Sequence, residues 1–120
     1  MKVIIDLIED IRESIANAEE YQMMAGLLKA DSKDATKLHY AGEAPLGEFR
    51  LDENARVLRL YVKPDGMLRV GELIPKLLIM DMDTMMYEIK VEVNDAYSNM
   101  EVVGFGKSDE EKRYILFIKV

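Results

Sequence analysis

KVIIDLIEDIRESIANAEEYQMMAGLLK, residues 2–29, is the stretch from which the rest of the chain is interpreted. Its apolar side chains recur at spacings of three and four residues, which place them on one stripe of an α-helix. We therefore predict one long amphipathic helix over Lys2–Lys29. The residues that form the stripe are Ile4, Leu7, Ile8, Ile11, Ile15, Ala18, Tyr21, Ala25 and Leu28.

The charges along this predicted helix agree with its direction. Acidic residues dominate its beginning, whereas Lys29 lies at its far end, as the helix dipole favours. The stripe weakens between Ala18 and Ala25, which is less typical of a coiled coil than of a helix laid across a sheet. We expect residues 4–15 to cover the protein's own sheet and residues 21–24 to contact a second molecule.

The segment after this helix is predicted to be β-structure. Residues 37–42 alternate in a way typical of a short edge strand, and residues 48–51 and 57–62 alternate on either side of the turn-prone residues 52–54. These last two runs predict a β-hairpin. The sequence KPDG at residues 63–66 favours a turn, because proline presets one backbone angle and glycine accepts a positive φ.

Residues 68–80, LRVGELIPKLLIM, carry apolar side chains at helical spacing. We predict a short helix here, although Pro75 lacks the N–H that a helix interior uses. The alternative is an apolar strand that Pro75 interrupts.

Three further strands complete the predicted fold. From Met85 the apolar period becomes two, and apolar runs continue at residues 100–105 and 113–120 between turn-prone segments. The last run is apolar on both faces, which predicts a central strand. We predict an α+β protein: a long N-terminal helix and one short helix packed on a mostly antiparallel sheet of about six strands, in the order α-βββ-α-βββ. The two halves share this order, but no repeat is evident at the residue level.

Composition limits the possible functions. The 120 residues are 49% hydrophobic, which predicts a single domain over residues 1–120 with its own core. The formal net charge is −7 and the basic residues are scattered among acids, which disfavours nucleic acid and anionic membranes as partners. The absence of cysteine excludes disulfides and thiol chemistry. Because Asp6 interrupts the first apolar run before a signal peptide can form, we expect a cytoplasmic location.

Acidic residues near predicted strand ends are the first candidate site. Asp81 and Asp83 follow an apolar run and Asp95 lies in a turn, so their carboxylates are possible oxygen ligands for a divalent cation. The run resembles the first motif of haloacid-dehalogenase phosphatases but lacks one residue before Thr84. A solvated turn is the favoured interpretation, because a two-residue motif is weakly specific. The single histidine, His39, has no recognisable nucleophile beside it, and we predict no metal or cofactor.

Methionines are the second candidate. Thioether side chains fill irregular gaps in cores, which is the favoured interpretation, and they also adapt to different partners on binding surfaces. In the second role, the predicted interaction surface consists of Tyr21, Met23, Met24, Met82, Met85 and Met86.

The acidic face of the first helix is the third candidate. Solubility alone explains its carboxylates, including Glu19 and Glu20, and is the favoured interpretation. The alternative is a docking surface for a basic partner segment, whose binding weakens with salt.

No catalytic constellation is recognisable, which favours a non-catalytic protein–protein interaction or chaperone-like module that self-associates, with a second copy or another protein as partner. In size, acidity and the order helix, strands, helix, strands, the chain resembles type III secretion chaperones, which implies a homodimer that binds partner proteins. It departs from them by ending in a predicted strand rather than a helix. The alternative function is a small-ligand or divalent-cation binding domain, or an enzyme, that uses Asp81, Asp83 and Asp95.

Overall fold

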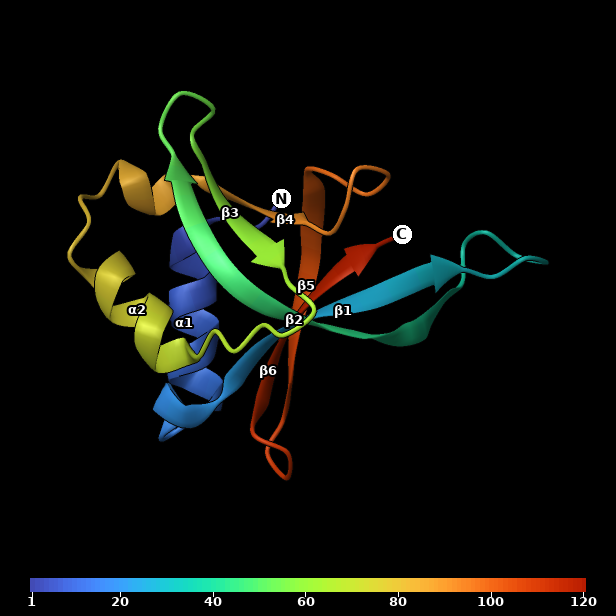
Figure 1. Ribbon diagram of the computed structural model, residues 1–120, viewed down its shortest axis with the longest axis horizontal. Coiled ribbons are helices and arrows are strands. Elements are labelled where there is room, and N and C mark those ends of the chain that lie inside the picture. The colour runs from blue at the N-terminus through green and yellow to red at the C-terminus, as the bar shows by residue number, and fades with distance from the viewer.

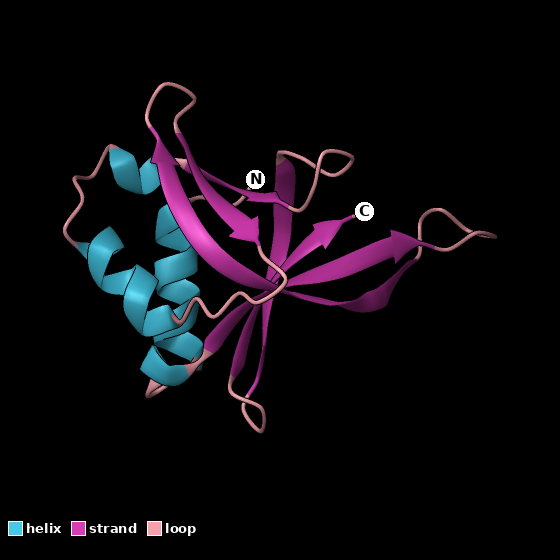
Figure 2. Ribbon diagram, viewed as in Figure 1, coloured by secondary structure: helices cyan, strands magenta, loops and turns pink.

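The computed structural model describes all 120 residues and contains two α-helices and six strands. Helix α1 (Ile4–Ser14) is followed by the 3₁₀ turn η1 (Ala18–Glu20) and by strand β1 (Gln22–Ala30). The prediction of one helix over residues 2–29 is therefore wrong, because the helix has 11 residues and the end of the stretch is a strand. The α+β class is confirmed, and both helices lie on one side of the molecule (Figures 1 and 2).

Strand β1 explains why the apolar spacing of the predicted helix weakens between Ala18 and Ala25. Tyr21, Met23 and Ala25 alternate with period two and join the core, and Tyr21 and Ala25 also fit the helical spacing, so the two patterns overlap. On the other face, the ring of Phe117 covers Gly26, where a Cβ atom would lie only 2.7 Å from that ring. Strand β1 is thus packed on both faces.

The remaining strands are β2 (Leu38–Asp52), β3 (Val57–Val62), β4 (Glu88–Glu92), β5 (Met100–Ser108) and β6 (Arg113–Lys119). They confirm the predicted hairpin and the three strands after it, and the sheet is mostly antiparallel as predicted. Two pairs are parallel instead, β1 with β6 and β3 with β4, and they close the sheet into a barrel. One face of the sheet is therefore the inside of the barrel.

Helix α2 (Val70–Leu78) confirms the helical interpretation of residues 68–80. Pro75 lies inside it and removes the N–H that would bond to the carbonyl of Gly71. Gly71 also allows close packing against η1, because a Cβ atom there would lie 2.9 Å from the carbonyl oxygen of Glu19. The helix contributes three side chains to the core, those of Val70, Leu73 and Leu77.

A partly buried hydrogen bond between two side chains joins helix α1 to strand β6 of the barrel. The hydroxyl of Tyr114 on β6 donates a hydrogen bond of 2.7 Å to the carboxylate of Asp10. Burial, together with this neighbouring carboxylate, raises the pKa of Tyr114. The hydroxyl therefore stays protonated and keeps donating. Around it, α1 adds four buried side chains to the core, those of Ile4, Leu7, Ile8 and Ile11.

The barrel is built from two equivalent halves, residues 1–66 and 67–120. The N–H of Ile4 donates to the carbonyl of Tyr87, and the N–H of Val70, 66 residues later, donates to the carbonyl of Tyr21. The same offset relates η1 to the second 3₁₀ turn, η2 (Thr84–Met86). Each half therefore places the start of its helix against the first strand of the other half.

The second and third strands of each half correspond with an offset of 56 residues, since Leu46 pairs with Val62 and Val102 pairs with Ile118. Both ladders are irregular just after this pair. The offset falls from 66 to 56 because the connection from β1 to β2, counted between equivalent paired residues, is ten residues longer than the connection from β4 to β5. The ten extra residues lengthen this connection into an arm, residues 27–42, that projects from the barrel (Figure 1).

The contact between Gly26 and Phe117 provides a test of β1. We expect Gly26→Ala to lower the free energy of unfolding by about 1–3 kcal/mol, because the added methyl group overlaps the ring. Gly104→Ala is the matched control on β5, where the nearest Phe117 atom lies 4.0 Å from the added Cβ. Urea denaturation measures both variants, and equal losses would contradict the packing described for β1.

Candidate functional site: an exposed apolar patch on α2

Four large apolar side chains are exposed within one short segment of the second half. Their exposed fractions are 53% for Leu78, 86% for Ile79, 82% for Met82 and 60% for Met86. Single exposed apolar residues are common on protein surfaces, but a group of this kind marks a candidate interaction site. Leu78 is the last residue of α2, and the other three lie between it and Tyr87, so we refer to these four residues as the α2 patch.

Polar contacts fix the segment that carries the α2 patch. The carboxylate of Asp81 accepts a hydrogen bond of 2.8 Å from the N–H of Thr84, and this bond lowers the pKa of Asp81. Asp83 accepts two hydrogen bonds, of 3.0 and 3.2 Å, from the guanidinium group of Arg56. The same guanidinium group lies 4.9 Å from the centre of the Tyr87 ring. The backbone between α2 and β4 is therefore held by ordered contacts.

The first half of the protein acts as an internal control for the α2 patch. Sixty-six residues earlier, the corresponding positions are also exposed, but none carries a large apolar side chain. The fold therefore does not require apolar residues at these positions. In the order of the patch, the counterparts are Arg12, Glu13, Ala16 and Glu20.

A groove adjoins the α2 patch between the end of α1, η1 and α2. Its volume is about 270 Å³, and Leu78 belongs to both the groove and the patch. The groove is mainly apolar, with Glu19 and Arg12 as its charged side chains. Its apolar lining consists of Ile11, Ile15, Ala16, Ala18, Val70, Ile74, Pro75 and Leu78.

The structure separates the six residues of the predicted interaction surface into two groups. Met82 and Met86 are exposed and belong to the α2 patch. Met23 is fully buried, and Tyr21, Met24 and Met85 are at most 8% exposed, so these four side chains pack inside the protein. The hydroxyl of Tyr21 donates a hydrogen bond of 2.6 Å to Asp109.

Leu78 and Ile79 were not part of the predicted interaction surface. A signal for them was present in the run LLIM at residues 77–80. Four consecutive apolar residues span more of a helix than its core-facing stripe, so some of them must face outward. Leu77 is the one that enters the core fully.

The three aspartates considered as cation ligands are not brought together. Asp81 and Asp83 lie before β4, where they bind Thr84 and Arg56, whereas Asp95 lies after β4 in an exposed turn. No group of three or more acidic, histidine or cysteine side chains is arranged to hold a metal ion. His39 lies exposed in the arm.

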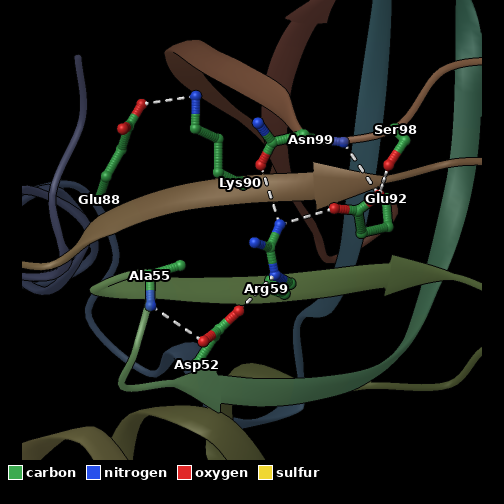
Figure 3. A network of polar contacts seen from close by, with 8 residues as sticks. All are labelled: Asp52, Ala55, Arg59, Glu88, Lys90, Glu92, Ser98 and Asn99. Atoms are coloured by element: carbon green, nitrogen blue, oxygen red, sulfur yellow. Dashed lines mark hydrogen bonds and ion pairs between the residues drawn. The ribbon is translucent and has the colours of Figure 1, made fainter.

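A charged network covers the outer face of β2, β3 and β4 (Figure 3). The guanidinium group of Arg59 lies 2.8 Å from Glu92 and 3.2 Å from Asp52, and it also donates to the side chain of Asn99. Glu92 accepts further hydrogen bonds from Ser98 and from the N–H of Asn99. The network fixes the turn after β4 to β3, which gives it a structural explanation.

Burial acts to raise the pKa of Glu92, but the hydrogen bonds from Ser98, Asn99 and Arg59 outweigh it and hold the pKa below the ordinary 4.5. Glu92 therefore adds stability above that pH and loses it as the pH falls through the lowered pKa. We expect Glu92→Gln to cost about 1–3 kcal/mol near neutral pH, with a smaller cost in acid. Urea denaturation across this range tests the network, and a cost independent of pH would contradict it.

Comparison of the chain with protein-family models, with curated proteins and with solved structures finds no match. Neither helix has the length and apolar character needed to span a membrane.

Proposed function

We propose that this protein is a non-catalytic protein–protein interaction module that self-associates through the α2 patch. The observation that carries the proposal is the difference between the halves: the second half exposes large apolar side chains where the first half has Arg12, Glu13, Ala16 and Glu20. Exposed apolar surface costs free energy in water, and a partner that covers it removes this cost.

The contacts around the patch support the same function. Arg56 neutralises Asp83 beside Met82, so a second copy can approach the patch without meeting an unpaired Asp83 carboxylate. The side chains of Met82 and Met86 are unbranched and flexible, which suits an interface that must fit its partner's shape. The alternative, a cation site formed by Asp81, Asp83 and Asp95, has less support because these carboxylates lie apart.

Replacement of the four patch residues by the residues at the equivalent positions of the first half tests the proposal. The variant Leu78→Arg, Ile79→Glu, Met82→Ala, Met86→Glu places at each position the residue that the first half already exposes there. We expect the wild-type protein to have at least twice the 13.8 kDa monomer mass, and the variant to have the monomer mass. Size-exclusion chromatography with light scattering measures both, and circular dichroism checks that the variant is folded.

The matched control replaces exposed apolar residues outside the patch, Met67→Glu and Val103→Glu, and should keep the wild-type mass. A folded patch variant that keeps an oligomeric mass would show that another surface mediates self-association. A monomeric wild-type protein at high concentration would contradict self-association itself.

A further inference from the structure

We propose that the groove between α1, η1 and α2 binds an amphipathic helix from another protein, and that the polar side of this helix carries lysine or arginine. The inference rests on the proposed function, because it names the partner segment that the interaction module takes. The groove shares Leu78 with the α2 patch but is otherwise formed by different side chains.

The size and lining of the groove suit side chains presented by a helix. Its volume is about 270 Å³, and a cavity of about 150 Å³ is enough for a benzene ring, so about two large apolar side chains fit. A helix presents such a pair at positions three or four residues apart on one face. Ile15, Ala18 and Ile74 provide an apolar lining for them.

The charge around the groove favours a basic partner. Glu9, Glu13 and Glu19 are exposed on α1 and η1, and none of them takes part in an ion pair of the protein. Arg12 is the single cation that lines the groove. Glu19 lines the groove itself, and Glu9 and Glu13 line an adjoining hollow that shares Arg12 with the groove. Lysine or arginine on the exposed side of a bound helix would therefore meet these carboxylates.

A second copy is less suited to the groove than to the α2 patch. The chain has a net charge of −7, and a second copy in the groove would bring its own acids to the unpaired glutamates of the first. A basic helix has the opposite charge, so attraction to these glutamates speeds its association and weakens as salt is added.

A designed peptide provides the probe. It has about 18 residues, with leucine at positions i, i+3, i+4 and i+7 of each helical repeat and lysine on the other face. Fluorescence anisotropy of the labelled peptide measures its binding to the full-length protein. An otherwise identical peptide with glutamate in place of lysine, and a scrambled leucine–lysine peptide, are the controls. We expect the basic amphipathic peptide to bind at least tenfold more tightly than either control, a difference of about 1.4 kcal/mol.

Two variants locate the binding site. Ala16→Trp fills the groove from an exposed position and should weaken binding about tenfold or more. The triple variant Glu9→Gln, Glu13→Gln, Glu19→Gln should weaken it about three- to tenfold and reduce its salt dependence. Its matched control, Glu53→Gln, Asp65→Asn, Glu110→Gln, removes the same charge from exposed acids elsewhere and should bind like wild type.

Three results would overturn the inference: binding of the acidic peptide as tightly as the basic one, loss of affinity in the control triple variant equal to that in the glutamate variant, or unchanged binding to Ala16→Trp. If the basic peptide fails to bind while the wild-type protein is a dimer that the patch exchange dissociates, the groove inference fails and the proposed function stands. Displacement of the peptide by dimer formation would assign the groove to a second copy and would also overturn the inference.

Discussion

The closure of the sheet by two parallel strand pairs is the constraint on which the rest of the structure depends. Antiparallel neighbours are joined by short turns, but a parallel pair requires a crossover connection. Helix α2 lies in the connection from β3 to β4, and α1 leads into β1, which closes the barrel against β6. Both helices therefore occupy one side of the barrel (Figure 2). The groove lies between the end of α1, η1 and α2, and the α2 patch begins at the last residue of α2 and continues to η2.

The two halves agree inside the barrel and differ outside it. Leu60 and Leu116 are equivalent and fully buried, because closure requires large apolar side chains at both positions. The outer positions carry no such requirement. Arg59 and Glu92 belong to the charged network beside β4, whereas their counterparts beside β1 are Ile115 and Gly26. The two halves therefore share their backbone pairing and differ in the side chains that they place on the outer face.

Local patterns predicted most elements of the fold, but not how they connect in space. The hairpin around residues 52–54, the helix containing Pro75 and the strands after it follow from period and turn chemistry. Strand β1 was missed because Tyr21 and Ala25 satisfy both helical and strand spacing. Its burial depends on β6, more than 80 residues later, and no local pattern contains that information. The repeat was hidden because equivalent core positions, such as Ile11 and Leu77, share mainly apolar character, whereas equivalent exposed positions, such as Glu13 and Ile79, differ in kind.

The same limit applies to the candidate site. Met82 and Met86 were predicted together with Met23 and Met85, which have the same chemistry, and the structure exposes the first two and buries the other two. Exposure is decided by the packing of α2 on the barrel, a tertiary property. The aspartates show the same limit at neighbouring positions. Asp81 binds a backbone N–H and Asp83 binds a guanidinium group, and the sequence does not indicate this difference.

The arm, residues 27–42, corresponds to the shorter turn at residues 93–98 of the second half. The second half makes the same turn from its first strand to its second with ten fewer residues, which shows that the barrel closes without this extension. The length of the arm is therefore free to vary without loss of the shared strand pairs. Insertions or deletions there would change how far the molecule extends from its barrel, while the side that carries the helices stays the same.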